Sequence, residues 1–309
     1  MFWLAEKAEQ VAEHAEKAPE QAAEHVPIIV KFVNHYLGPW AYNFEMKYTY
    51  PKWKWFFAKF GTTPESVFGG PYTPENAIPW YTVMFFIACI LSVVILWILK
   101  GKLSEDDPSN RQQTLEVSVL AVRNMLADII GPHGLQYFPV IMTFAVLILV
   151  CNLMGQFPLF MTPTAATSVT FALGISSFLY YNYVGIKENG VLGHLKHLAG
   201  PIWWIAPLIF LIELISNLVR PFSLGIRLFG NMFADEKVFE TVSGLAPPWT
   251  YFAFPVLMVL TALGVFVALI QTFVFILLSQ LYISEVSHPP HEEHEHDHDH
   301  ETAEEPLAA

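Results

Sequence analysis

Charged residues are scarce in this 309-residue sequence. Asp, Glu, Lys and Arg together make up 14% of it, whereas soluble domains carry about 25%. The hydrophobic fraction is 54%, and the mean hydropathy is positive. This composition predicts a membrane protein. The net charge of −12 comes mainly from the two ends of the chain, and the sequence has no basic stripe, so we do not expect nucleic-acid binding.

Cysteines and nucleotide-binding motifs are also few or absent. The two cysteines, Cys89 and Cys151, lie in long apolar runs, which predicts small buried side chains rather than a disulfide or a metal pair. No Gly-x-x-x-x-Gly-Lys-Ser/Thr sequence occurs, so we expect no phosphate-binding loop and no catalytic site for ATP. Residues 1–24 lack the apolar core of a signal peptide.

Long apolar runs dominate the sequence from residue 80 onward. A helix needs about 20 apolar residues to span a bilayer. The predicted spans are residues 80–99, 137–157, 168–186, 204–242 and 251–284. The fourth could be about 60 Å long, twice the thickness of a bilayer core, so it must tilt, lie partly flat or bend. Pro221 inside it predicts a kink. We therefore predict an all-α polytopic membrane protein with five membrane-crossing helices, the last two forming a long tilted hairpin.

Residues 103–135, between the first two spans, predict a helix on the membrane surface. Leu115, Val119, Val122 and Leu126 recur at helical spacing and would share one face. Gly and Pro residues end this pattern at 131–134. We expect the apolar face to rest on the membrane surface.

Two segments flank the predicted membrane domain of residues 71–285. Residues 1–70 form an N-terminal extension, in which residues 1–25 carry a thin apolar helical stripe that predicts a solvated or partner-facing helix, with membrane contact as the alternative. Residues 32–60 are rich in aromatic residues, with five lysines interleaved over 31–59. That pattern is typical of a segment at the headgroup level, although an aromatic cap on the protein is an open alternative.

Residues 286–309 form a tail of His, Asp, Glu and Pro, which cannot bury a core and is expected to be disordered. Its six histidines could chelate zinc or nickel weakly, but we expect a solvated tail with no dedicated metal.

The distribution of Lys and Arg around the spans predicts the orientation of the chain. The flanks 61–79, 158–166 and 243–250 contain neither residue. The opposite loops contain Lys100, Lys102, Arg111, Arg123, Lys187 and Lys196. Basic loops face the cytoplasm, so we predict an outside N-terminus and a cytoplasmic C-terminus. The lysines of residues 31–59 argue mildly against this orientation.

The fourth predicted span contains many ionisable residues, unlike the first three, which hold no Lys, Arg, Asp or Glu. The charged residues of this span are Glu213, Arg220, Arg227, Asp235, Glu236, Lys237 and Glu240. Each Arg or Asp at a membrane centre costs about 2.5 to 3.5 kcal/mol on insertion scales. Structural stabilisation is a poor reason for such a cost. The pattern therefore predicts a water-filled pathway or a charge relay.

The spacing of these residues divides them between two faces. Glu213, Arg220 and Arg227 are seven residues apart, so they fall near one face of a helix. The residues close to the same stripe are Ser216, Asn217, Ser223, Asn231 and Asp235. Glu236 is nine residues from Arg227 and points roughly the opposite way. One polar face is thus expected to meet a partner or a path, while Glu236 serves another surface.

The run from Glu213 to Glu236 resembles the signature of the a subunit of F-type ATP synthases. Its core is the sequence Arg227-Leu-Phe-Gly-Asn-Met. Further matches are Asn152-Leu-Met-Gly, Pro158, Val169-Thr170 and Gln271-Thr-Phe. The resemblance covers about residues 75–285 and leaves out the N-terminal extension and the tail.

The resemblance implies that Arg227 is the essential arginine that faces the rotor ring of c subunits. A guanidinium stays charged at any working pH. It favours the ionised form of a carboxylate that passes close to it in a low-dielectric interface. A proton would therefore be released on one side of Arg227 and regained on the other. The fixed charge would also block direct leakage between two offset half-channels.

The resemblance also implies roles for other residues. Asn231 corresponds to a polar residue beside the arginine, and Gln271 to the residue packed opposite it. Glu236 corresponds to the acidic residue of the half-channel open to the outside, and Glu213 to the acidic residue near the cytoplasmic exit.

One pair of positions departs from the family pattern. Some members pair a glycine before the glutamate with a histidine in the last helix, whereas this chain has Asp235 and Gly264 there. Whether Asp235 takes the relay role is left open. Ser223 and Arg220 are expected on the rotor-facing stripe, and for Arg220 an anchoring contact is favoured over a second relay charge.

The implied function is that of a stator subunit in the membrane sector of an F-type ATP synthase, which couples proton flow to rotation and ATP synthesis. The implied partners are the c-subunit ring, the b subunits of the peripheral stalk and the lipid bilayer of the bacterial inner membrane, with no cofactor and no metal. Protons are favoured over Na⁺. The alternatives are an independent ion-coupled secondary transporter, which often shows internal repeats that are not seen here, and a purely structural scaffold.

Overall fold

The computed structural model is all-helical in the part of the chain that it describes, with eight α-helices, two short 3₁₀ helices and no strand there. It describes residues 27–59, 61–62, 73–101, 103–105, 107–157, 160–199, 204–245 and 253–287. The expectations for residues 1–25 and for the His-rich tail beyond residue 287 lie outside these residues. The described residues confirm an all-α architecture.

Five of the helices are long and apolar enough to cross a membrane, which confirms the expected number of spans. They are Trp80–Lys100, Pro132–Met154, Thr167–His194, Pro207–Gly244 and Pro255–Ser287. The chain divides into two compact units, of which the first comprises residues 1–90 and 153–163 and the second residues 91–152 and 164–309.

The N-terminal unit contains helices α2 (Ile28–Tyr48) and α3 (Tyr50–Ala58). Asn34 of α2 holds the loop that precedes the first span, because its side chain donates to the carbonyl oxygen of Ile78 and accepts from the amide of Ile78, both at 3.0 Å. Gly38, one turn later, allows the carbonyl of Pro74 to lie directly against α2. The loop is thereby fixed to one face of α2.

The aromatic residues of α2 and α3 are largely exposed. Those with the most open side chains are Phe32, Tyr36, Trp40, Phe44, Tyr48, Trp53, Trp55 and Phe56. Neither helix is among the five that are long and apolar enough to span a bilayer. The placement of this segment at the headgroup level remains a prediction.

Helix α5 (Trp80–Lys100) is the first span, and α6 (Asn110–Ile130) follows it after a short loop. The Ser109 hydroxyl caps α6 by accepting from the amide of Gln112. Val122, Leu126 and Ile130 are buried in one cluster with Ile276 and Ile283 of the last helix. The C-terminal half of α6 therefore packs its apolar face against the last helix. In the N-terminal half, Leu115 and Val119 of the same face are only half-buried.

The second span is split between a 3₁₀ turn, η1 (Pro132–Tyr137), and α7 (Phe138–Met154). Gly131, at φ 87°, ends α6 and lets the chain turn into η1. Helix α7 ends three residues before the predicted limit of 157. At Gly155 the Thr162 hydroxyl lies where a Cβ would be. A short 3₁₀ turn, η2 (Pro163–Ala165), then leads into the next helix.

Helix α8 (Thr167–Ala199) is longer than the predicted span of 168–186. Lys187 and Glu188 do not end it, and the Glu188 carboxylate accepts a hydrogen bond from Tyr137 at 3.1 Å. The kink comes instead at Gly190, whose φ of 69° is non-helical. Polar residues near a helix end are thus a weaker stop signal here than a glycine with positive φ.

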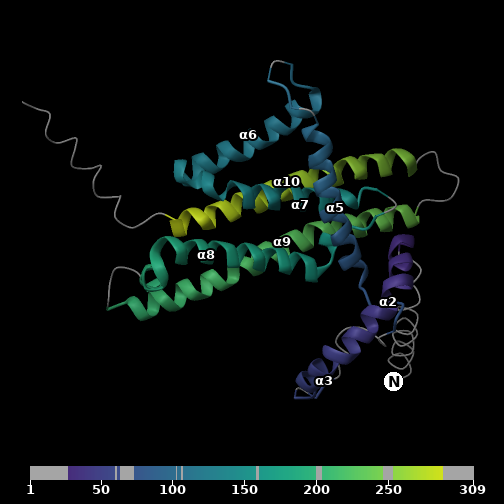
Figure 1. Cartoon of the computed structure of the whole chain (residues 1–309), viewed down its shortest axis with the longest axis horizontal. Coiled ribbons are helices and arrows are strands. Elements are labelled where there is room, and N and C mark those ends of the chain that lie inside the picture. The colour runs from purple at the N-terminus through teal and green to yellow at the C-terminus, as the bar shows by residue number, and fades with distance from the viewer. Residues whose placement is uncertain are drawn as a thin grey trace, which may run out of the picture. The chain divides into compact units, whose positions relative to one another are not determined.

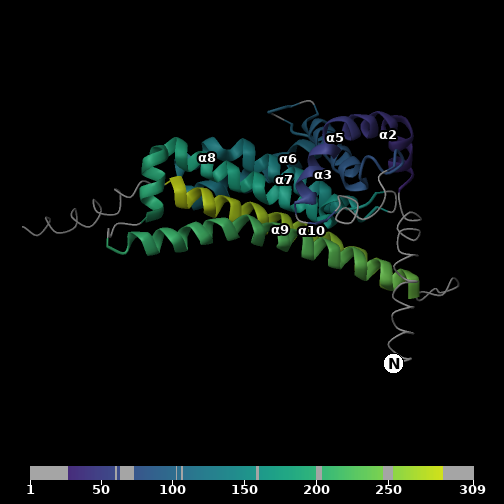
Figure 2. The ribbon, with the colours of Figure 1, turned by 90° about the horizontal axis from the view of Figure 1, so that it is seen from below.

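Helices α9 (Ala206–Leu245) and α10 (Ala253–Ser287) form the expected long pair. Figures 1 and 2 show α8, α9 and α10 running alongside one another. Helices α8 and α9 approach closely at Gly174, where a Cβ would lie 2.6 Å from the carbonyl oxygen of Pro221. Gly225 lies against Phe171 of α8 in the same way. Small residues on both helices therefore permit the contact, as is common in membranes.

Candidate functional site

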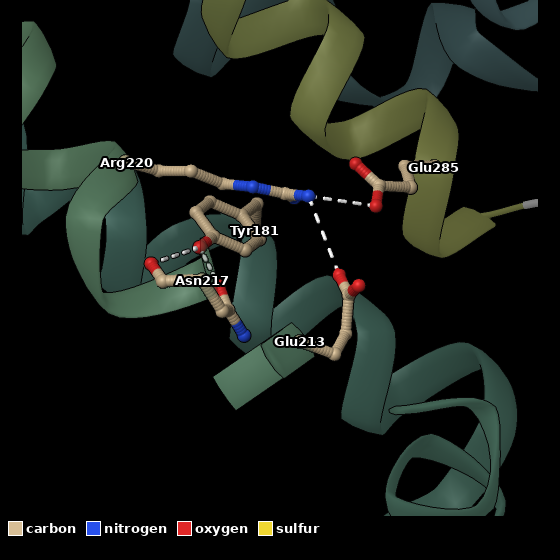
Figure 3. Close-up of polar contacts among 5 residues, drawn as sticks. All are labelled: Tyr181, Glu213, Asn217, Arg220 and Glu285. Carbon is tan, nitrogen blue, oxygen red and sulfur yellow. Dashed lines mark hydrogen bonds and ion pairs between the residues drawn. The ribbon is translucent and has the colours of Figure 1, made fainter. Parts of the chain in front are cut away.

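Arg220 of α9 lies at the centre of an ion-pair cluster that joins α9 to α10 (Figure 3). Its Nη2 atom donates to Glu285 of α10 at 2.7 Å and lies 3.5 Å from the carboxylate of Glu213 on its own helix. The guanidinium also lies 5.0 Å from the centroid of the Tyr282 ring. The Arg220 side chain is only 16% exposed. One cation therefore serves two carboxylates at a half-buried position.

A second polar contact in this region compensates for Pro221. Proline has no amide hydrogen, so the carbonyl of the residue four positions earlier, Asn217, loses its helical hydrogen bond. The hydroxyl of Tyr181 from α8 donates to that carbonyl at 3.3 Å and also to the Asn217 side-chain oxygen (Figure 3). Tyr181 is 2% exposed. Helix α9 accordingly continues through Pro221 as one helix, and the expected effect of the proline is partly offset by α8.

Glu285, Tyr282 and Tyr181 are the residues around Arg220 and Asn217 that sequence reasoning missed. The predicted last helix ended at residue 284, one residue before Glu285, because an acidic tail follows. The signal that could have found Glu285 was the neighbouring cation: Arg220 in an apolar helix requires a counter-charge, and one carboxylate seven residues away is a weak partner. Tyr181 had no signal beyond its polar hydroxyl in an apolar run.

Arg227 differs from Arg220 in its surroundings. Its side chain is exposed, whereas Leu224 and Leu228, which flank it on α9, are buried. No ion pair joins Arg227 to any carboxylate in the part of the chain that the structure describes. Ser223, one turn earlier, is also exposed. Arg227 thus combines a fixed charge with an open face of the helix.

The turn after Arg227 is tied to α10 by a hydrogen bond. The side-chain nitrogen of Asn231 donates to the side-chain oxygen of Gln271 at 2.6 Å. Gln271 is 2% exposed, and its amide nitrogen has no hydrogen-bond partner among the described residues. The structure therefore brings together Asn231 and Gln271, two of the residues singled out from the sequence, next to the turn that carries Arg227.

The other acidic residues of α9 lie apart from Arg227. Asp235 and Glu236 are half-buried, and Lys237 forms an ion pair with Glu240 at 2.6 Å. Glu213 lies about four helical turns before Arg227 and contacts Arg220 instead. The residues predicted from the sequence thus fall into three groups along α9: the Arg220 cluster, the Arg227–Asn231 turn and the Asp235–Glu240 segment.

Uncharged polar pairs fix α10 against its neighbours. Asn152 of α7 accepts from Thr164 at 2.7 Å and donates to Thr272 at 3.5 Å. The hydroxyls of Ser177 and Ser279 lie 2.9 Å apart between α8 and α10. Interhelical hydrogen bonds of this kind stabilise contacts between membrane helices by about 1 kcal/mol each. They join α10, the helix that carries Gln271, to α7 and α8.

Comparison with known proteins identifies the family. The model of the ATP synthase A chain family matches residues 82–284. The ATP synthase subunit a 2 of Syntrophotalea carbinolica is 43% identical over 184 residues, which is 60% of this chain and 76% of that protein. The ATP synthase subunit a of Trichlorobacter lovleyi is 43% identical over 208 residues, 67% of this chain and 85% of that protein.

A third relative gives the same result. The ATP synthase subunit a of Geobacter sulfurreducens is 42% identical over 194 residues, which is 63% of this chain and 82% of that protein. None of these matches supports an independent secondary transporter. The motif around Arg227, the five apolar helices and the match over residues 82–284 agree, and the chain belongs to the ATP synthase A chain family, whose members are proton-translocating subunits of the membrane sector of F-type ATP synthases.

Proposed function

We propose that Arg227 is the fixed charge that separates two offset proton half-channels at the surface facing the c-subunit ring. The observation that carries this proposal is the contrast between the two arginines of α9. Arg220 is neutralised within the chain by Glu285 and Glu213, whereas Arg227 is exposed on a helix that is long and apolar enough to span a membrane. A costly charge left open in a span needs a partner from elsewhere.

A carboxylate on the rotor is the partner that the chemistry requires. A guanidinium near such a group lowers the cost of its ionised form. The carboxylate would then lose its proton as it nears Arg227 and regain one after passing it. Asn231 and Gln271 support this step by holding the Arg227 turn of α9 against α10 through their 2.6 Å hydrogen bond. Ser223 lies on the same exposed face and would line the ring contact.

The two proton paths are assigned to the two ends of α9. Glu236 and Asp235 lie half-buried toward the C-terminal end and would line the half-channel that opens to the outside. Glu213 lies toward the N-terminal end and would mark the cytoplasmic exit. Arg220 is assigned here to holding Glu213 and Glu285 rather than to the ring surface, because its guanidinium is engaged by both carboxylates.

The remaining assignments follow from the family and from charge. The chain is a multi-pass protein of the bacterial inner membrane, with the N-terminus outside and the C-terminus in the cytoplasm in our assignment. Its partners would be the c-subunit ring and the b subunits of the peripheral stalk, with H⁺ as the transported ion. Residues 1–70 would form an interfacial extension to a membrane domain of residues 71–285, followed by a solvated tail.

The proposal is tested in vesicles that contain the assembled ATP synthase. We expect Arg227→Ala to abolish both ATP-driven proton pumping and gradient-driven ATP synthesis while the complex still assembles. Arg123→Ala is the matched control, since Arg123 is an exposed arginine on α6 outside the α9–α10 pair. Coupled pumping that survives in Arg227→Ala would show that this arginine is structural. Transport by the isolated chain in the absence of a ring would favour the transporter alternative instead.

A further inference from the structure

A hollow of about 400 Å³ lies where the first span ends and the surface helix begins. The residues that line it are Trp97, Ile98, Lys100, Gly101 and Arg111. The first four belong to the end of α5 and the turn that follows it, and Arg111 belongs to the first turn of α6. The hollow is remote in sequence from every residue assigned to proton transfer.

The loop around this hollow is held by specific hydrogen bonds. Gly101 has a φ of 50°, which lets the chain leave α5 in a sharp turn. Gln112 of α6 binds both backbone groups of Ser104, since its oxygen accepts from the amide at 3.0 Å and its nitrogen donates to the carbonyl at 2.9 Å. Gln112 is only 5% exposed. The side chain next to Arg111 therefore fixes the loop to the start of α6.

Among the residues that the structure describes, the charged side chains that line the hollow are both positive. They are Lys100 and Arg111, and both are exposed. Of the described acidic residues nearby, Glu105, Asp107 and Glu116 do not line the hollow, and Glu116 accepts a 2.7 Å hydrogen bond from Gln112. The compact ammonium of Lys100 and the planar guanidinium of Arg111 both bind oxygen-rich anions such as phosphate.

The other wall of the hollow is apolar and continues along the outer face of α5. Trp97 is 76% exposed, and Ile98 and Val93 are also open. Helix α5 has the length of a membrane span, so its end at Lys100 lies near the level of the lipid headgroups. An occupant of the hollow must therefore present an anion to Lys100 and Arg111 and a hydrocarbon surface to Trp97.

We propose that this hollow is a binding site for one anionic phospholipid. Its phosphate is held by Lys100 and Arg111, and its acyl chains lie along Trp97, Ile98 and the open face of α5. Basic pockets beside membrane helices bind anionic headgroups in this way. The inference does not depend on the assignment of Arg227, because the two sites share no residue. Free phosphate has the same anionic chemistry but lacks the hydrocarbon that the apolar wall would cover.

The test uses the assembled complex reconstituted in vesicles of phosphatidylcholine with 20% phosphatidylglycerol, part of it carrying a photoreactive group near the headgroup. After irradiation, peptide mass spectrometry locates the adducts. We expect adducts on the peptides that contain Trp97–Gly101 and Arg111. Lys100→Gln combined with Arg111→Gln should weaken this labelling by about thirtyfold, because each basic residue contributes about 1 kcal/mol to binding of anionic lipid and 1.4 kcal/mol is tenfold.

Controls separate a specific site from general attraction to the membrane. Arg123→Gln removes a charge from the same helix outside the hollow and should leave the labelling unchanged. Unlabelled phosphatidylglycerol should compete, whereas inorganic phosphate should not. The proposal is overturned if a photoreactive phosphatidylcholine labels the same peptides equally, if inorganic phosphate competes, if the double variant labels like the wild type, or if the peptides cross-link to a neighbouring protein instead. Retained proton pumping in the double variant confirms that it is folded.

Discussion

Removing Arg220 should destabilise the chain more than removing either of its carboxylate partners. Both Glu213 and Glu285 contact the same nitrogen of Arg220, at 3.5 and 2.7 Å. Loss of one carboxylate leaves the guanidinium with the other and with the ring of Tyr282. Loss of the guanidinium leaves two like charges facing one another with no cation between them. The stability costs of the variants therefore differ because the cluster contains two carboxylates and one guanidinium.

The magnitude can be worked out from these distances. Two carboxylate oxygens that contact one nitrogen lie no more than about 6 Å apart, where two unit charges repel by about 3 kcal/mol at an effective dielectric constant of 20. The side chains of Glu213 and Glu285 are 35% and 43% exposed, so solvent screening reduces this by roughly half. Adding the lost charge-assisted hydrogen bonds gives a cost of about 2 to 3 kcal/mol for Arg220→Gln. Glu285→Gln or Glu213→Gln should each cost about 0.5 to 1 kcal/mol.

The assay measures the temperature at which this chain is released from the purified complex in detergent. It compares the three single variants and the triple Gln variant. The triple variant removes all three charges and should recover much of the stability that Arg220→Gln loses, because it leaves no like charges facing one another, and neutral replacement of a whole ionic cluster is often close to neutral in energy. If Glu285→Gln proves as damaging as Arg220→Gln, or if the triple variant is the least stable, the account of like-charge repulsion is wrong.

Three further predictions address packing and polar contacts. Gly174→Ala should destabilise the chain by about 1 to 3 kcal/mol, because the added Cβ would lie 2.6 Å from the Pro221 carbonyl oxygen. Gly230→Ala is the control: its added Cβ would meet no described atom within 4 Å, so the thermal stability should be equal or higher. Equal losses in the two variants would refute the packing argument. Gln271→Leu should lower coupled proton pumping while costing about 1 kcal/mol of stability, because it removes the acceptor of Asn231, and pumping at the wild-type rate would show that this bond is dispensable. Gln280→Leu should raise the thermal midpoint, since the buried amide has no hydrogen-bond partner for either of its polar atoms among the described residues; a marked fall would mean that the amide is satisfied in the assembled protein.

The helices could be predicted from the sequence because membrane spans depend on the length and polarity of a single segment. The run from Trp80 to Leu99 predicts α5 almost to the residue, since its apolar run ends at a lysine and a glycine. The end of α8 could not be predicted in this way. Lys187 and Glu188 look like a loop, but Glu188 accepts a hydrogen bond from Tyr137 of η1, and the helix continues to its kink at Gly190.

The contacts of the candidate site were harder to predict, because they depend on the register between helices. The Arg227 motif and its resemblance to a known family indicated Asn231 and Gln271, and the structure brings these two together. Nothing in the local sequence related Arg220 to Glu285, which lies 65 residues away. The register that aligns them is set by the packing of α8, α9 and α10 as a whole.

The segment from Asn217 to Asn231 must satisfy two opposite requirements. A charge on an open helix face can be held in position only if the rest of the helix is fixed, yet any nearby carboxylate that fixed it directly would also neutralise it. The chain meets the first requirement through contacts on either side of Arg227. The Pro221 carbonyl packs against Gly174, and the Tyr181 hydroxyl binds the Asn217 carbonyl, which lacks a helical hydrogen bond because of Pro221. Gln271 binds Asn231. The carboxylates of Glu213 and Glu285 are engaged by Arg220. On this argument Arg220 acts by joining the helices that hold Arg227 in position, so Arg220→Gln should reduce proton pumping even at temperatures where the complex is still fully assembled, and pumping at the wild-type rate would refute it.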